Sequence, residues 1–286
     1  MDGAVNAPHP ATRAAASRDF DIELRLLLEA VYLKYQHDFR HYAYASLRRR
    51  MRQAMERFEC PTLSHLQGRM LHEPEVFASM LQYFTVQVSE MFRDPAYFRA
   101  IRERVVPLLQ TYPYVKVWVA GCSTGEEAWS FAILLREAGL LERALIYATD
   151  INPQALATAE AGVYAADRIA GFSANYLAAG GASSLSDYYT AAYGQAVFDR
   201  RLRAQIVFSD HSLATDNVFS EVELVSCRNV LIYFNRQLQT RAIGLFHDAL
   251  APRGFLGIGS RETLRFSPRA SAFEEFAAAE RIYRKA

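Results

Sequence analysis

The chain has 286 residues, of which 51% are hydrophobic and 22% are charged, and its net charge is +1. This composition is typical of a globular protein with one large or two smaller domains, and the length can bury a core without a disulfide or metal staple. A charge near zero excludes a chain that is basic throughout, so any basic surface must be local.

The three cysteines are Cys60, Cys122 and Cys227, and they form neither a CxxC pair nor a cluster with histidine. This spacing argues against a zinc site and against a disulfide framework, and free thiols are typical of a reducing cytosol. No apolar run approaches the ~18 residues of a membrane span. We therefore expect a cytoplasmic protein with no metal and no membrane insertion, and with a disordered tail over residues 1–19 that lacks the features of a secretory signal.

Apolar residues at helical spacing dominate the segment that follows the tail. Four helices are expected there, at 20–33, 39–58, 62–71 and 74–84. No strand-like run interrupts them. The pattern predicts a small all-α domain over residues 20–90.

Strand-like runs alternate with helical ones after Pro113. Strands are expected at 115–120, 144–149, 222–227 and 254–259, and helices at 125–138, 153–161 and 236–250. This alternation predicts βαβ units and a mostly parallel sheet, which is an α/β fold. Residues 163–205 are too long for a tight connection and contain two strand-like pieces, at 195–199 and 204–208, so we expect an inserted β-rich subdomain there.

The strand at 115–120 leads into a helix through a turn that Gly121 and Gly125 bracket. Glycine there permits a positive φ and lets a ligand approach the backbone at the carboxyl end of the strand. Glu126 and Glu127 open the helix, where they would repel a phosphate, so the turn favours a ligand with hydroxyl groups or a positive charge. The alternative is a plain turn whose two acids complement the helix dipole.

Polar residues also follow the strands expected at 144–149 and 222–227. Asp150 lies 25 residues after Gly125, close to the ~20-residue offset at which nucleotide-binding βαβ units place an acid that binds ribose. The alternative for Asp150 is an N-cap of the following helix. Arg228, Asn229 and Tyr233 follow the apolar strand at 222–227, although a tyrosine in that position is more often a core aromatic.

Four segments together resemble the chemotaxis receptor glutamate O-methyltransferases, the CheR family. They are MFRDPAYF (91–98), WVAGCSTGEEAWS (118–130), YATDINPQALATAEAGVY (147–164) and SCRNVLIYFN (226–235). The resemblance runs from about residue 20 to residue 286. It implies an N-terminal helical domain over residues 20–90 and, over 91–286, a Rossmann-like methyltransferase domain that carries a small β-subdomain insert and binds S-adenosylmethionine.

The resemblance also implies roles for particular residues. Arg93 and Tyr233 would be catalytic, with Arg93 near both the sulfonium methyl and the substrate carboxylate, and Asp150 would bind the ribose. The full set implied for the cofactor is Gln87, Ser89, Arg93, Glu127, Asp150, Ser212, Leu213, Arg228 and Asn229. Five positions depart from the residues that are usual in the family: Ser89 stands for Thr, Ser212 for Asn, Ala128 for Pro, Arg261 for Ser, and Gln87 for an Asn, whose amide it carries on a longer arm.

Between Lys34 and Arg57 there are seven basic residues against Asp38 and Glu56, a local charge of +5. The plainest interpretation is a solvated helix face. A nucleic-acid site lacks any motif or supporting global charge, so we expect no nucleic-acid partner. The resemblance implies instead that Arg48, Arg49 and Arg52 dock on the acidic coiled coil of a chemoreceptor's cytoplasmic methylation region.

The expected reaction is methyl transfer from S-adenosylmethionine to receptor glutamates, with S-adenosylhomocysteine as the product. Two alternatives stay open: a methyltransferase for another protein or a small molecule, and a regulatory module that binds the cofactor without turnover. Family members that bind a receptor's C-terminal pentapeptide carry a longer, glycine-rich loop in the insert, where this chain has only TAAYGQ at 190–195. We therefore expect no pentapeptide tether.

Overall fold

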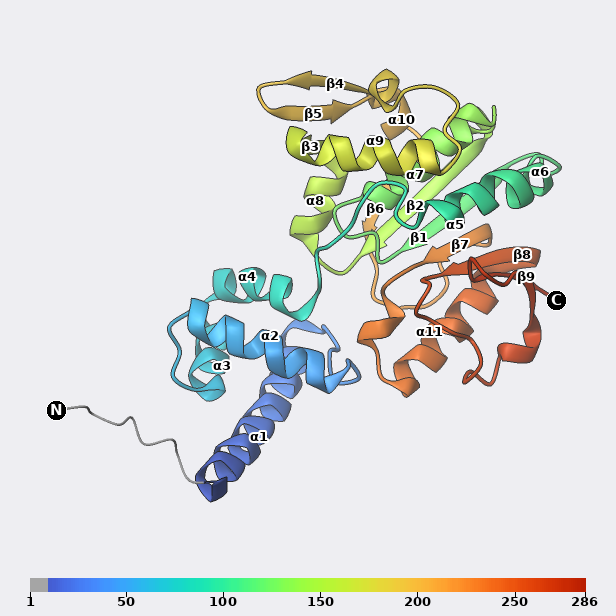
Figure 1. Cartoon of the computed structure of the whole chain (residues 1–286). Helices are drawn as coiled ribbons and strands as arrows, with labels where there is room; N and C mark the ends of the chain where they lie inside the picture. Colours follow the sequence, from blue (N-terminus) through green and yellow to red (C-terminus); the bar gives the residue numbers. More distant parts are fainter. Residues whose placement is uncertain (1–9) are drawn as a thin grey trace. The chain divides into compact units, whose positions relative to one another are not determined.

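The structure, a computed structural model, describes residues 10–286, with side chains described from Ser17 onward. The described residues form two compact units that divide between Thr85 and Val86, a few residues before the expected boundary at residue 90. Figure 1 follows the chain through both units by colour.

Four helices make up the described part of the first unit, which confirms the predicted all-α character. They are α1 (Pro10–Tyr35), α2 (Tyr44–Arg57), α3 (Leu63–His72) and α4 (Pro74–Phe84). The apolar side chains of Leu24, Leu27 and Val31 are at most 2% exposed. The helical spacing read from the sequence therefore marks the face of α1 that packs in the core of this unit.

Two boundaries in this unit differ from the sequence predictions. The disordered tail predicted over residues 1–19 is wrong for its second half, because α1 begins at Pro10; residues 1–9 lie outside the described residues. Alanine is the best helix former and proline suits the first helical position, so the alanine-rich segment extends the helix. The second helix begins at Tyr44 and not at residue 39, since Asp38 accepts a hydrogen bond from the Arg40 amide (3.1 Å) and such local bonds compete with a helix.

The second unit is built on a seven-stranded sheet in the order β6-β2-β1-β7-β8-β10-β9. The first five strands in that order are parallel, and near one edge β10 runs antiparallel to both of its neighbours, β8 and β9. The strands are β1 (Val115–Ala120), β2 (Ala144–Asp150), β6 (Ile206–Asp210), β7 (Val222–Cys227), β8 (Leu250–Ile258), β9 (Phe273–Ala277) and β10 (Ile282–Lys285).

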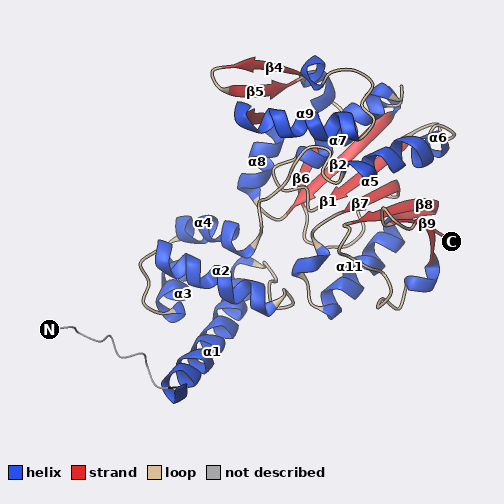
Figure 2. Ribbon diagram, in the orientation of Figure 1, coloured by secondary structure: helices blue, strands red, loops and turns tan. Residues whose placement is uncertain are grey.

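Helices cover both faces of this sheet (Figure 2). On one face Val117 and Val119 of β1 join a buried apolar cluster with Phe131 of α7. On the other, the ring of Trp118 meets that of Phe246 in α11, with centroids 5.4 Å apart. The helices are α5 (Pro95–Ala100), a π-helical turn η1 (Ile101–Val105), α6 (Val106–Leu109), α7 (Glu126–Glu137), α8 (Pro153–Ala161) and α11 (Arg236–Ala249). The predicted Rossmann-like α/β class is confirmed.

The predicted insert contains a three-stranded antiparallel sheet in the order β3-β5-β4, together with helices. Its elements are β3 (Val163–Ala165), α9 (Ile169–Ala178), β4 (Tyr189–Ala192), β5 (Gln195–Phe198) and α10 (Arg200–Arg203). The strand-like piece expected at 204–208 does not belong to it. That piece is β6, which pairs with β2 at the edge of the main sheet, because a short half-exposed edge strand has the same pattern in either sheet.

The strand order brings the predicted polar residues to one edge. From β1 the chain proceeds outward to β2 and β6 on one side, and β7 and β8 lie on the other side. The order in which the chain adds strands therefore reverses between β1 and β7. Such a reversal is a topological switch point, and α/β proteins bind ligands there, at the carboxyl ends of the strands. The Gly121 turn, Arg228 and Gly259 follow such ends, and Asp150 is the last residue of β2.

Candidate functional site

The turn after β1 needs both of its glycines. Gly121 has φ +74° and Gly125 has φ +91°. A Cβ on Gly121 would lie 2.6 Å from a methyl carbon of Val230, and a Cβ on Gly125 would lie 2.6 Å from that of Ala159. Any larger residue would therefore have to adopt a strained φ and also displace a neighbour. The turn keeps its backbone close to the segments that follow β7 and β2.

Asp150 is held at the end of β2 by this turn. Its two carboxylate oxygens accept hydrogen bonds from the amides of Ser123 (2.9 Å) and Asn152 (3.0 Å). Burial raises the pKa of Asp150, and these amides oppose the rise because they stabilise the carboxylate. The N-cap of α8 is Asn152, which accepts from the Gln154 amide. The alternative that Asp150 is the cap is therefore wrong.

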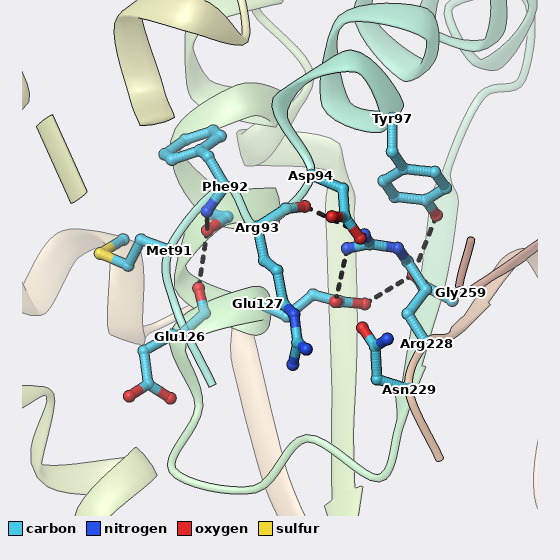
Figure 3. A network of polar contacts seen from close by, with 12 residues as sticks. Met91, Phe92, Arg93, Asp94, Tyr97, Glu126, Glu127, Arg228, Asn229 and Gly259 are labelled. Carbon is cyan, nitrogen blue, oxygen red and sulfur yellow. Dashed lines mark hydrogen bonds and ion pairs between the residues drawn. The ribbon is translucent and has the colours of Figure 1, made fainter. Parts of the chain in front are cut away.

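Arg228 lies at the centre of a buried polar network (Figure 3). Its side chain is 1% exposed and forms ion pairs with Glu127 (3.1 Å) and Asp94 (2.6 Å). Its Nη2 also donates to the carbonyl of Arg93 (3.0 Å), and the guanidinium carbon lies 4.1 Å from the centroid of the Tyr97 ring. Because the side chain is enclosed, we infer that Arg228 acts on the site through Glu127 and Arg93.

Two hydroxyl groups extend this network beneath Glu127. Ser226 donates to a Glu127 oxygen (2.6 Å), and the Tyr97 hydroxyl lies 2.9 Å from Ser226 Oγ. Burial raises the pKa of Tyr97 well above its usual range, so the hydroxyl stays protonated. Asp94, Tyr97 and Ser226 were not among the site residues predicted from the sequence, although all three lie inside the segments MFRDPAYF and SCRNVLIYFN.

Arg228 binds the backbone carbonyl of Arg93, whereas the Arg93 side chain lies outside the buried polar network. In Figure 3 the dashed line reaches the Arg93 carbonyl, and the guanidinium extends away from it. The Arg93 Nη1 donates to the Val88 carbonyl at 3.3 Å. Its neighbours Phe92 and Asp94 have φ +50° and +55°, a conformation that costs non-glycine residues about 1–3 kcal/mol each. The strained backbone on both sides fixes the direction in which Arg93 leaves the chain.

The loop after β7 is fixed by a carboxylate that the sequence analysis missed. Glu262 is 4% exposed and accepts hydrogen bonds from the amides of Asn229 (3.2 Å), Ile232 (3.2 Å) and Gly259 (2.5 Å). Burial raises the pKa of Glu262 and the backbone donors oppose that rise. The signal available in the sequence was an acid just after the strand at 254–259, at the same edge as the other polar residues.

The segment before Arg93 is tied to the turn and to the insert. Ser123 donates to the side-chain oxygen of Gln87 (2.7 Å). Arg168, at the start of the insert, donates to the carbonyl of Ser89 and pairs with Glu126 (2.8 Å), whose side chain is fully buried. Of the two acids at the start of α7, Glu126 therefore pairs with Arg168 of the insert and is fully buried, whereas Glu127 pairs with Arg228 and stays 13% exposed.

The remaining predicted residues lie on neighbouring segments. Ser212 and Leu213 follow β6, whose last residue Asp210 pairs in register with Asp150. The Ser212 amide donates to Asp216 (2.9 Å), and Leu213 is 7% exposed. Tyr233 ends the short 3-10 helix η5 (Leu231–Tyr233) and is half-buried.

The three predicted docking residues lie on α2 of the first unit and differ from one another. Arg48 pairs with Asp21 (3.1 Å), whereas Arg49 and Arg52 are exposed. Arg50, which the sequence counted in the same basic run, is buried and donates to the Phe84 carbonyl. The accessible positive charge is therefore smaller than the run suggests.

Within residues 10–286, no three His, Cys, Asp or Glu side chains are placed to hold a metal ion together. No helix in that part of the chain combines the length and the apolar character that crossing a membrane requires.

These residues fit S-adenosylmethionine by their chemistry. Asp150 offers a buried carboxylate to ribose hydroxyls, and Glu127 offers one to a ligand's ammonium group. Both suit a cationic, hydroxyl-bearing ligand better than a phosphate. The close-packed glycine turn directly precedes Glu127 in the chain, binds Asp150 through the Ser123 amide, and can admit a ligand near its backbone.

Replacing Asp150 with asparagine should lower the affinity for S-adenosylhomocysteine by roughly tenfold, because the ribose hydroxyls lose a charged acceptor worth about 1.5 kcal/mol. Asparagine can still accept from the Ser123 amide, so the turn should keep its shape. Titration calorimetry measures the effect, and Asp167→Asn, on the insert, is the matched control. Unchanged affinity in the Asp150 variant would remove this residue from the binding site.

Two family models match the chain: the CheR methyltransferase all-alpha domain over residues 22–85 and the CheR methyltransferase SAM-binding domain over residues 87–279. A Pseudomonas putida protein named Cher3 is 57% identical over 270 residues, which cover 94% of this chain and 99% of that protein. An uncharacterised 104.1 kDa protein of Rhodobacter capsulatus is 31% identical over 92% of this chain, but over only 28% of its own length. A chemotaxis protein methyltransferase of Listeria innocua is 29% identical over 64% of this chain and 68% of its own. With both domain models matched in order and together spanning most of its length, the chain belongs to the CheR family of S-adenosylmethionine-dependent methyltransferases.

Proposed function

We propose that this methyltransferase esterifies glutamate side chains in the cytoplasmic methylation region of chemoreceptors. The observation that supports this most directly is the setting of Arg93. Its backbone is fixed by Arg228 and by the strained residues on either side, while its guanidinium stays outside the buried network. A fixed arginine with an available planar fork suits the orientation of a carboxylate acceptor.

In this reaction the protein does not have to remove a proton from the acceptor. A surface glutamate has a pKa of about 4.3 and is already ionised at neutral pH. No general base is required, and alignment of donor and acceptor can supply about 7–11 kcal/mol of the barrier reduction. We assign the carboxylate-orienting role to Arg93, supported by a neutral hydrogen bond from the Tyr233 hydroxyl.

S-Adenosylmethionine supplies an electrophilic methyl group on a sulfonium when it is bound. Glu127 would hold its ammonium group, Asp150 its ribose hydroxyls, and Ser212 and Leu213 would line the adenine. Gln87, Ser89 and Asn229 complete the proposed pocket. Arg228 would hold Glu127 in place through their ion pair without touching the cofactor.

Transfer of a tritiated methyl group tests the proposal. Incubation of the protein with labelled S-adenosylmethionine and a receptor cytoplasmic fragment should give a labelled receptor whose label is released by mild alkali, as an ester requires. Alkali-stable label would point to a different acceptor atom in the protein substrate. A receptor that gains no label, while cofactor binding is normal, would favour another substrate or a module without turnover.

The exposed arginines of α2 provide a proposed docking site for the acidic receptor helices. Charge reversal at Arg49 and Arg52 should raise KM for the receptor by about tenfold or less per residue, since each exposed charge pair contributes about 0.2–1 kcal/mol. The binding of S-adenosylhomocysteine should not change. Salt should weaken the wild-type interaction, because exposed charges are screened over ~8–10 Å at 0.1–0.15 M. If neither the charge reversal nor added salt changes KM, the exposed face of α2 is a solvated surface and not a docking site.

The insert supports recognition without a C-terminal tether. Its hairpin turns through only Tyr193 and Gly194, both with positive φ (+50° and +72°). Such a two-residue turn leaves no additional loop to shape a pocket beside β4. A receptor C-terminal pentapeptide should therefore show no micromolar binding in calorimetry, and removing that tail from the receptor should leave its methylation rate unchanged.

A further inference from the structure

A groove of about 370 Å³ lies beside the loop that carries Asn229 and Tyr233. Its walls come from η5, from the start of α11 and from the segment after β8, and they include Ile232, Arg236, Gln239, Arg261 and Phe266. We call it the η5 groove. None of the residues that the family resemblance assigns to the cofactor lines it.

The η5 groove is cationic. Arg236 and Arg261 are both exposed, and among the described residues neither forms an ion pair or a hydrogen bond through its guanidinium. The acid that lines the groove, Glu262, is 4% exposed, accepts three backbone hydrogen bonds and, among the described residues, forms no ion pair with either arginine. Two guanidinium groups in one cavity without an acidic partner favour an anionic occupant.

The groove also has an apolar part. Phe266 is 62% exposed and Ile232 is 39% exposed. The Arg236 guanidinium carbon lies 4.6 Å from the centroid of the Phe266 ring, which holds that arginine over an apolar wall. A small inorganic anion would leave these side chains in water, whereas a peptide can cover them and pair with the arginines.

Hydrogen bonds connect two residues that line the groove, Gln239 and Glu262, to the loop that carries Tyr233. Gln239 donates to the carbonyls of Leu231 (2.9 Å) and Phe234 (3.1 Å), one on each side of Tyr233. Glu262 binds the amide of Ile232 and that of Asn229. A segment bound in the groove would therefore lie next to the proposed catalytic tyrosine, on a loop that cannot shift without breaking these bonds.

We propose that the η5 groove binds acidic side chains of the protein substrate that flank the acceptor glutamate. This inference rests on the proposed function and adds a determinant of substrate choice on the catalytic unit itself. On a helical substrate, side chains three or four residues apart lie about 5–6 Å apart on one face. Carboxylates at that spacing from the acceptor can pair with Arg236 and Arg261 while the acceptor faces Tyr233.

Binding of a fluorescein-labelled helical peptide tests the proposal by anisotropy with the full-length protein and saturating S-adenosylhomocysteine. One peptide carries glutamates three and four residues from a central glutamate, and a second carries glutamines at those flanking positions. The variant is Arg236→Glu/Arg261→Glu. The matched control is Arg200→Glu/Arg253→Glu, which makes the same change in net charge at two exposed arginines that do not line the groove.

Wild type and control should bind the acidic peptide at least tenfold more tightly than the glutamine peptide, and the groove variant should lose that preference. Unchanged affinity for S-adenosylhomocysteine in the groove variant shows that it is folded. Equal loss in the control, loss of cofactor binding in the groove variant, or equal binding of both peptides by wild type would each overturn the proposal. Because the readout is binding, a wild-type protein that shows the preference but esterifies no peptide would contradict the proposed function and leave the groove assignment in place.

Discussion

Replacing Arg93 with alanine is expected to lower kcat for receptor methylation at least a hundredfold. The ordered backbone around Arg93 remains in this variant, because Arg228 binds its carbonyl and not its side chain. What is lost is the fork that aligns the acceptor carboxylate, and a misplacement of about 1 Å can cost roughly 10²-fold in rate. Single-turnover transfer of a labelled methyl group measures the step itself, free of product release.

Three further variants separate positioning from charge and from folding. Arg93→Lys keeps the positive charge without the planar fork, so most of the loss should persist. Tyr233→Phe removes one neutral hydrogen bond and should slow transfer about tenfold with little change in cofactor affinity. Arg200→Ala, an exposed arginine of the insert, should behave as wild type. Transfer by Arg93→Ala at the wild-type rate would contradict the orienting role.

The central parallel strands β1 and β7 were predictable because they are almost wholly buried and therefore appear as continuous apolar runs, whereas the half-exposed parallel edge strand β6 was assigned to the insert. Residues 115–120 match β1 and 222–227 match β7. The antiparallel strands β9 and β10 were not expected. Their sequences, FEEFA and IYRK, mix charged and apolar residues, and they become strands through pairing with each other and with β8. Strand propensity follows such context more than local composition.

The positions of the polar residues were predictable only as far as the sheet edge. Spacing placed Asp150 and Arg228 after strands, and the parallel sheet brings those ends together. Spacing could not predict that Arg228 pairs with Asp94, 134 residues earlier in the chain. Nor could it predict that Glu262 accepts hydrogen bonds from the backbone of the loop after β7. These contacts depend on where α5 and the segment after β8 pack, which no local pattern encodes. The role of Arg93 came from the family resemblance, since by spacing alone an arginine beside an aspartate is a surface pair.

The second large effect is expected at Arg228. Substitution by methionine removes both ion pairs and leaves Glu127, whose side chain is 13% exposed, with the Ser226 hydroxyl as its one remaining donor among the described residues. Asp94 is 43% exposed and can be hydrated, so the cost falls mainly on Glu127. Removing one partner of a buried pair costs about 3 kcal/mol or more. Urea unfolding followed by tryptophan fluorescence reports this unit, because both tryptophans of the chain, Trp118 and Trp129, lie in it.

Adding Glu127→Gln to Arg228→Met should restore part of the lost stability, because the uncompensated charge is gone and a neutral amide costs less to bury. Methyl transfer should not recover in the double variant. Loss of the Arg228 donor removes the hydrogen bond that holds the Arg93 carbonyl, and the strained φ values of Phe92 and Asp94 can relax toward ordinary ones. Cofactor binding should also stay weak, since the carboxylate proposed to hold the ammonium group is absent. If the double variant recovers stability but not methyl transfer, the Arg228 network positions the site residues as well as stabilising the fold. Recovery of both together would mean that its charge balance alone matters, and a stable, fully active Arg228→Met protein would remove the network from the mechanism.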